Sequence, residues 1–157
     1  MEKVTLNKEL TFTFPDGFHI MDAQEKSSLN FAAEGEGFCL SDPDRHVIIT
    51  TAWQRLGMVS SMLLTAKDVA KTNEAQYSDA MMQNNYKRLS RTEREIAGFK
   101  VNGYNYEYIA GGTSMYGESV VIKSGKTMYY LHFYSRADLK EPNISCWEGI
   151  LSSLEKN

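Results

Sequence analysis

The chain has 157 residues, of which 42% are hydrophobic and 24% are charged. This length and composition fit one soluble globular domain, so we expect residues 1–157 to form a single domain, and disordered and collagen-like classes are excluded. The net charge of −3 arises from 17 basic and 20 acidic residues. Because the basic residues are scattered, nucleic acid is not an expected partner.

The N-terminal segment MEKVTLNKEL has neither the apolar core of a signal peptide nor a cysteine for lipid attachment. No apolar run elsewhere is long enough to predict a transmembrane segment. We therefore expect a cytoplasmic protein as the sequence is written, or an exported protein if a signal peptide has been removed.

The first predicted elements are strands. ELTFTF alternates, with Leu10, Phe12 and Phe14 on one face, and the Pro-Asp-Gly turn that follows predicts a hairpin with FHI. A second hairpin is predicted at SDPDRH, between an incoming FCL strand and an outgoing HVIITTAW strand.

A long helix is predicted to begin at Thr65, whose hydroxyl can cap it while Asp68 adds negative charge to the first turn. We expect this helix to run to about Tyr86. Apolar residues recur along it at spacings of three and four and form a stripe that should lie on a sheet. The stripe consists of Ala66, Val69, Ala70, Tyr77, Ala80 and Met81.

Four alternating stretches then follow, separated by turns that contain glycine, and they predict an antiparallel meander. The predicted strands cover residues 87–96, 99–110, 113–123 and 127–135. In the second strand, Phe99 and Val101 have one parity and the tyrosines have the other, so we expect a β-bulge at Gly103. The first strand, KRLSRTER, alternates with acidic residues and is predicted to be a solvated edge.

A second helix is predicted to close the chain. Pro142 suits its first turn. Its apolar stripe consists of Ile144, Trp147, Ile150, Leu151 and Leu154.

The Gly-Lys-Thr tripeptide in IKSGKTMYY resembles the end of a nucleotide-binding P-loop. The full pattern, GxxxxGK[ST], needs a glycine where this chain has Val120. The residues from Thr127 onward also predict an aromatic strand, whereas a P-loop continues into a helix. We interpret Ser124, Gly125 and Lys126 as a hairpin turn and expect no bound nucleotide or other cofactor.

No metal site is expected, because the three histidines, at positions 19, 46 and 132, fall in separate strands. Asp42 and Asp44 near His46 fit a tight turn better than a cation site. No GxSxG motif is present, so no catalytic residue is predicted. A fold that brings Ser119 or Cys39 to a histidine stays open, because catalytic groups assemble across distant sequence.

The two cysteines, Cys39 and Cys146, lie in a predicted strand and a predicted helix. Free cysteine in such contexts commonly behaves as a small buried hydrophobe. A disulfide between them stays open as well, because spacing in the sequence does not give distance in space.

Aromatic residues are concentrated in the last strands, above all in TMYYLHFY. Period two sends Tyr129, Leu131 and Phe133 to one face, which we predict to be core. The opposite face carries side chains with polar tips on apolar bodies, which suits packing under a second helix or contact with a partner. This candidate contact surface consists of Met128, Tyr130, His132 and Tyr134.

The order of elements, with the motifs FTFPDGFHI, ITTAW, LTAKDVA, IAGFKVNGYNYEY, GKTMYYLHFYS and GILSSL, resembles the PsbP-like superfamily over nearly the whole chain. That superfamily includes photosystem II PsbP, a Ran-binding import factor, DcrB-type bacterial proteins and chaperones of type VI secretion effectors. The resemblance, to a bacterial member, implies an α+β fold. It implies an antiparallel β-sheet of about six or more strands, with a long middle helix and a C-terminal helix packed on it.

The resemblance also implies no catalytic centre and a function through protein or ligand contact. We therefore expect a non-catalytic protein-binding adaptor or chaperone-like domain whose partner is another protein. The alternative is a small-ligand carrier with an aromatic-lined pocket, and a hydrolytic enzyme is less expected. A closed pocket would favour the carrier, an open groove would favour the adaptor, and a histidine bonded to a Ser or Cys would favour the hydrolase.

Overall fold

The computed structural model describes residues 1–27 and 37–157. Most of its strands form one antiparallel sheet. The strands of this main sheet are β3 (His19–Ile20), β4 (Cys39–Asp42), β5 (Val47–Arg55), β6 (Lys87–Ile96), β7 (Phe99–Ala110), β8 (Thr113–Ser124) and β9 (Thr127–Arg136). Their order across the sheet is β3-β4-β5-β9-β8-β7-β6. The predicted meander is thereby confirmed, with β6 as a solvated edge strand.

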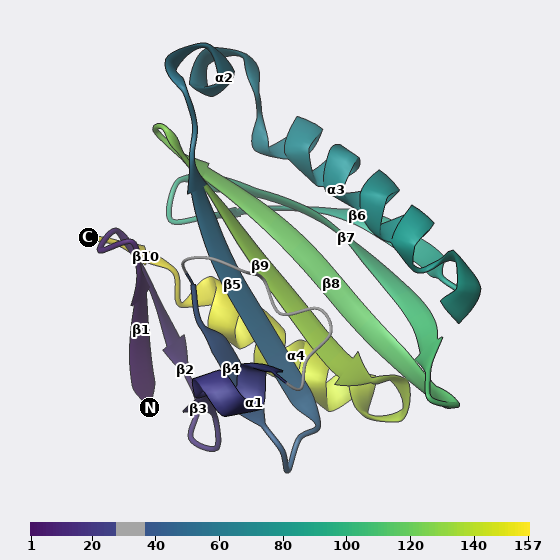
Figure 1. Cartoon of the computed structure of the whole chain (residues 1–157). Coiled ribbons are helices and arrows are strands. Elements are labelled where there is room, and N and C mark those ends of the chain that lie inside the picture. Colours follow the sequence, from purple (N-terminus) through teal and green to yellow (C-terminus); the bar gives the residue numbers. More distant parts are fainter. Residues whose placement is uncertain (28–36) are drawn as a thin grey trace.

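A second, smaller sheet has β2 (Leu10–Phe14) between β1 (Glu2–Leu6) and β10 (Glu155–Lys156). The helices are α1 (Ala23–Ser27), α2 (Met58–Leu63), α3 (Ala66–Ala80) and α4 (Lys140–Ser152), with 3-10 turns η1 (Met82–Asn84) and η2 (Ala137–Leu139). In Figure 1, α3 lies on one face of the main sheet, and α4 and the small sheet lie on the other. The fold is α+β, as predicted.

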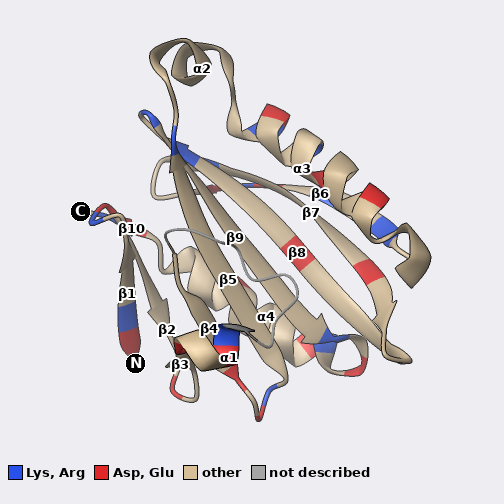
Figure 2. Ribbon diagram, viewed as in Figure 1, with Lys and Arg blue, Asp and Glu red and all other residues tan. Residues whose placement is uncertain are grey.

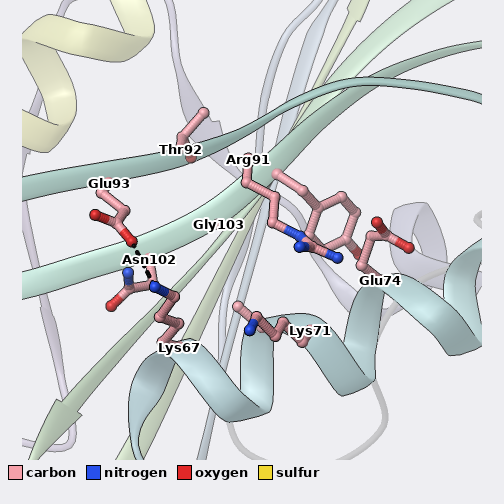
Figure 3. A pocket seen from close by; sticks show the side chains of 10 residues that line it. Lys67, Lys71, Glu74, Arg91, Thr92, Glu93, Asn102 and Gly103 are labelled. Carbon is pink, nitrogen blue, oxygen red and sulfur yellow. Dashed lines mark ion pairs between the residues drawn. The ribbon is translucent and has the colours of Figure 1, made fainter.

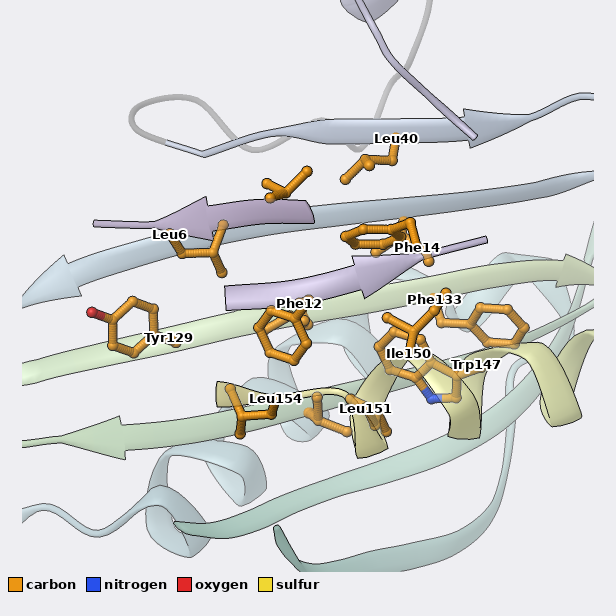
Figure 4. Packing of buried hydrophobic residues seen from close by; sticks show 14 of the residues in the cluster. Leu6, Phe12, Phe14, Leu40, Tyr129, Phe133, Trp147, Ile150, Leu151 and Leu154 are labelled. Atoms are coloured by element: carbon orange, nitrogen blue, oxygen red, sulfur yellow. The ribbon is translucent and has the colours of Figure 1, made fainter. Parts of the chain in front are cut away.

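The largest core cluster lies between the main sheet, α4 and the small sheet (Figure 4). Alternation along β9 places Tyr129, Leu131 and Phe133 in this cluster, which confirms their prediction as core. Trp147 of α4 stacks on Phe133, with ring centroids 5.2 Å apart. This face of β9 is therefore occupied by structural packing.

The predicted hairpin after ELTFTF is wrong. Strand β2 pairs with β1 and β10, and β3 pairs with β4 in the other sheet. The turn that contains Gly17, with φ of 110°, carries the chain from one sheet to the other. The second predicted hairpin, between β4 and β5, is confirmed.

The predicted bulge at Gly103 is also wrong. The register between β7 and β8 is continuous from Val101 to Ala110, and the irregularity of this region lies in β6, between Arg88 and Ser90. No bulge is needed, because β7 is buried on both faces from Val101 to Tyr104, where the apolar parity changes. Gly103 is instead required for close approach, since a Cβ atom there would lie 2.1 Å from the Ser119 carbonyl oxygen.

Helix α3 begins as predicted. The Thr65 hydroxyl accepts a hydrogen bond from the Asp68 amide at 3.1 Å, and the Asp68 carboxylate accepts one from the Thr65 amide at 3.4 Å. The helix ends at Ala80, before the predicted Tyr86, because the chain tightens into η1 and Asn85 adopts a left-handed conformation with φ of 55°. Tyr86 can then pack beside the tyrosines of the sheet.

Cys39 lies in β4 and Cys146 in α4, as predicted, and both are free thiols. No helix in the described part of the chain combines the length and the apolar character that a membrane span requires.

Candidate functional site

An open groove of about 540 Å³ lies beside α3, on the sheet face opposite α4. Helix α3 packs on β7 and β8, and the groove lies next to it, over β5 and β9. Its described lining residues are Thr50, Thr51, Ala52, Gln54, Asn73, Gln76, Tyr77, Ala80, Tyr104, Ser119, Tyr130, His132 and Tyr134. None of these side chains is a carboxylate, an ammonium or a guanidinium.

A cluster of tyrosines forms the inner wall of the groove. Tyr104, Tyr106 and Tyr108 alternate along β7 and share one face with Tyr134 of β9. Tyr77 of α3 packs on this cluster, with its ring centroid 4.9 Å from that of Tyr106. The cluster holds α3 against the sheet and fixes the position of the groove.

His132 lies between the tyrosine cluster and the open part of the groove. Its ring stacks on Tyr134 with centroids 4.2 Å apart, and its Nε2 atom shares a hydrogen bond with the Tyr106 hydroxyl. Burial lowers the pKa of His132 to about 3 and raises the pKa of Tyr106 well above its usual value. Both groups are therefore neutral near pH 7, so His132 is a poor general base there.

Ser119 is the residue on β8 directly opposite His132, so the fold does bring these two onto one face. No hydrogen bond joins them among the described residues, and the Nε2 atom of His132 bonds Tyr106 instead. Cys39 is buried, and that burial raises the pKa of its thiol, which disfavours the reactive thiolate. Among His132, Ser119 and Cys39, the structure shows no hydrogen bond between a nucleophile and a base of the kind that a hydrolase uses.

The four residues of the candidate contact surface all face the α3 side of the sheet. Met128 is 0% exposed and Tyr134 is 4% exposed, because Met128 packs beneath α3 and Tyr134 belongs to the tyrosine cluster. Met128 and Tyr134 therefore belong to the core and not to the predicted contact surface. Tyr130 and His132 remain partly exposed, and the Tyr130 hydroxyl donates to Gln54 Oε1 at 3.3 Å.

A second hollow lies between α3 and strands β6 and β7 (Figure 3). Charged side chains of both signs surround it, and Lys67 pairs with Glu93 at 3.3 Å. Its volume is about 20 Å³, room for a single water molecule. This hollow is too small for a ligand, so we interpret it as part of the contact between α3 and the sheet.

A buried ionic cluster lies on the other face of the sheet. Glu118 of β8 binds both terminal nitrogens of Arg94, at 2.8 and 2.9 Å, and accepts a hydrogen bond from the Trp147 indole at 2.8 Å. Burial lowers the pKa of Arg94, but its hydrogen bonds to Glu118 and Glu148 raise it more, so the guanidinium stays charged. The cluster joins α4 to β6 and β8 and has a structural role.

The sequence DPDRH forms a turn, as predicted. Asp42 accepts hydrogen bonds from the amides of Asp44, at 3.1 Å, and Arg45, at 3.3 Å. Within residues 1–27 and 37–157, no group of three or more His, Cys, Asp or Glu side chains gathers around a common point. Ser124, Gly125 and Lys126 form the predicted turn between β8 and β9, where Gly125 has φ of 57°.

No protein-family model matches the chain, and no curated protein matches it in sequence. Solved structures do match. Cyanobacterial PsbP (CyanoP) from Synechocystis sp. PCC 6803 is similar with a TM-score of 0.73 and 15% identity, covering 99% of this chain and 92% of that chain. The chain therefore has the PsbP-like fold, as the resemblance implied.

Two further structures share this fold. LpqN of Mycobacterium tuberculosis, described as involved in cell envelope biogenesis, has a TM-score of 0.60 and 13% identity, covering 94% of this chain and 83% of LpqN. The Ran-binding protein Mog1p of Saccharomyces cerevisiae has a TM-score of 0.58 and 10% identity, covering 98% of this chain and 94% of Mog1p. At sequence identities this low, structural similarity establishes a common fold only. The function has to be argued from the site.

Proposed function

We propose that this chain is a non-catalytic adaptor or chaperone-like protein, and that it holds another protein in the groove beside α3. The observation that carries this proposal is the character of the groove, which is open, uncharged and lined by aromatic, amide and hydroxyl side chains. Tyr130 and His132 line the groove and are the residues of the predicted contact surface that remain partly exposed.

The chemistry of the groove suits an uncharged segment of a protein. Gln54, Asn73 and Gln76 can donate to and accept from peptide groups, while the bodies of Tyr77 and Tyr130 offer apolar contact area. Tyrosine is also enriched among residues that dominate binding energy at protein interfaces. A phosphorylated or strongly anionic ligand would find no cation among the described lining residues.

The fold neighbour Mog1p is described as a Ran-binding protein, so a protein partner is compatible with this fold. The main alternative is a small-ligand carrier. It is favoured by the volume of about 540 Å³, which falls within the range of small-molecule sites, roughly 300–1,000 Å³. The openness of the groove favours the adaptor, because carriers enclose most of the surface of a small ligand.

The test compares capture of proteins from a native lysate by the intact chain and by two variants. Tyr130→Ala removes a partly exposed aromatic side chain that lines the groove. Leu89→Ala is the matched control, because Leu89 is an exposed apolar residue on the edge strand β6, away from the groove. We expect one specific protein to be retained by the wild type and by Leu89→Ala, and retention by Tyr130→Ala to fall about tenfold or more.

Equal capture by all three proteins would reject the groove as the contact surface. Native mass spectrometry of the purified chain distinguishes the adaptor from the small-ligand carrier, because it detects a bound small molecule. A bound small molecule that Tyr130→Ala loses, with no protein captured, would reject the adaptor in favour of the carrier.

A further inference from the structure

Helix α2 lies at one end of the molecule, beyond the ends of β5 and β8 (Figure 1). Met58, Val59, Met62 and Leu63 are between 69% and 79% exposed, and no residue of this six-residue helix is buried. Large apolar side chains gathered on one exposed element mark an interaction site. We call these four residues the α2 tip.

The α2 tip is held in place by polar contacts on its inner side. The Lys123 ammonium donates to the Leu64 carbonyl at 2.6 Å and also to the Ser61 carbonyl. These are carbonyls of the last turn of the helix, where a cation is favourable. Before the helix, the Leu56 amide donates to the Lys126 carbonyl at 2.6 Å. The helix that carries the exposed apolar side chains is therefore fixed to the sheet by hydrogen bonds.

The strand ends and the turn that adjoin the α2 tip contain no acidic residue, and acidic residues at this end of the molecule include Asp68 in the first turn of α3 and Glu93 and Glu95 of β6. No Asp or Glu occurs between Asp44 and Asp68, and none occurs between Glu118 and Asp138. These two stretches contain β5, α2 and the β8–β9 turn. Arg55 and Lys126 lie at the base of α2, and neither makes an ion pair with any residue in the described ranges.

The opposite end of the same strands carries acidic and basic residues together, in ion pairs such as Arg45 with Asp42 and Arg136 with Asp138. Asp44 precedes β5 and Asp138 follows β9, and the pairing of Val47 with Ser135 places them at one end of the sheet. Figure 2 shows acidic and basic residues together in the connections at that end, and basic residues where β5 and β8 approach α2. Although the chain has a net charge of −3, Arg55, Lys123 and Lys126 lie beside α2 and give the α2 tip a local positive charge that suits an anionic surface.

We propose that the α2 tip docks on the surface of an anionic lipid membrane. Met58, Val59, Met62 and Leu63 enter the headgroup region, and Arg55 and Lys126 pair with anionic lipid headgroups. Apolar side chains that enter the headgroup region, together with cations that attract anionic lipids, give reversible attachment to such a surface. A stable protein interface engages about 20–30 residues on each side, far more than the α2 tip offers. The α2 tip shares no residue with the groove. Membrane docking can therefore be tested independently of the proposed adaptor function.

The test is co-sedimentation of the intact chain with phosphatidylcholine vesicles that contain or lack phosphatidylserine. Met62→Ser combined with Leu63→Ser removes half of the α2 tip without touching the core. Met82→Ser is the matched control, because Met82 is 71% exposed and lies beyond the other end of α3. We expect the wild type and Met82→Ser to bind the vesicles with phosphatidylserine, and the double variant to bind about tenfold or more weakly.

The role of charge is tested by Arg55→Gln combined with Lys126→Gln. We expect this variant to bind weakly at low salt and to lose most of the salt dependence that the wild type shows. Absence of wild-type binding, equal binding to vesicles without phosphatidylserine, or undiminished binding of the double apolar variant would each overturn the proposal. Loss of a captured protein by the double apolar variant, without vesicle binding by the wild type, would assign the tip to a protein partner instead.

Discussion

Neighbouring side chains on β9 occupy two different environments, one on each face of the main sheet. Leu131 is completely buried in the cluster beneath α4, and Tyr130 lies partly exposed at the groove. We expect Leu131→Ala to lower the free energy of unfolding by about 2 to 5 kcal/mol, because it leaves a cavity in the core. Tyr130→Ala should cost about 1 kcal/mol or less.

Chemical denaturation of both variants, followed by circular dichroism, measures this difference in stability. The contrast matters for function because a contact residue must be removable without unfolding the domain. A Tyr130→Ala protein that is destabilised as strongly as Leu131→Ala would show that both faces of β9 are core at this position.

His132 should make the stability of the protein depend on pH. Its pKa is lowered from 6.5 to about 3 by burial, so between these two values the unfolded chain binds a proton that the folded chain does not. The free energy of unfolding therefore falls as the pH drops below about 6.5, and the contribution of His132 is fully lost near pH 3. At pH 5 the loss amounts to up to about 2 kcal/mol.

The pH dependence is isolated by comparing the wild type with His132→Gln, in which the amide can still bond the Tyr106 hydroxyl. Between pH 7 and pH 5 the wild type should lose more stability than the variant, since the carboxylates contribute equally to both proteins. Parallel stability curves for the two proteins would mean that His132 titrates alike in the folded and unfolded chains.

Among the secondary-structure elements, those fixed by local chemistry were predictable from the sequence. The strands β6 to β9 follow from alternation and glycine turns, and the start of α3 follows from Thr65 and Asp68. These signals lie within a few residues of the element that they define. The partner of β2 was not predictable in this way, because pairing with β1 and β10 depends on residues at both ends of the chain.

The groove and the α2 tip were only partly predictable for the same physical reason. Alternation correctly placed Met128, Tyr130, His132 and Tyr134 on one face of β9, but burial on that face depends on where α3 crosses the sheet. The segment MVSSML is mostly apolar, as a core element would be. The exposure of this segment follows from its position beyond the ends of β5 and β8, which the sequence pattern does not give.

At the scale of the whole molecule, the described residues form two sheets and two long helices, and elements of both sheets share one hydrophobic core. Residues of β1 and β2 lie in the same core cluster as residues of β9 and α4, for instance Phe12 with Leu131 and Trp147. The last strand, β10, returns to pair with β2, and the Thr13 amide donates to the Ser153 hydroxyl at 2.8 Å. The two ends of the chain are thereby part of one structure, which favours a single cooperative domain.

This architecture predicts that the N-terminal strands do not unfold separately from the main sheet. Phe12→Ala should lower the free energy of unfolding by about 3 to 5 kcal/mol, because Phe12 is almost completely buried between the small sheet and α4. Denaturation is followed by far-ultraviolet circular dichroism, which reports the sheets, and by the fluorescence of Trp53 and Trp147, which both pack against this cluster. The two transitions should coincide in the wild type and shift together in the variant, as in a two-state domain. Transitions that separate in either protein would instead divide residues 1–157 into two units.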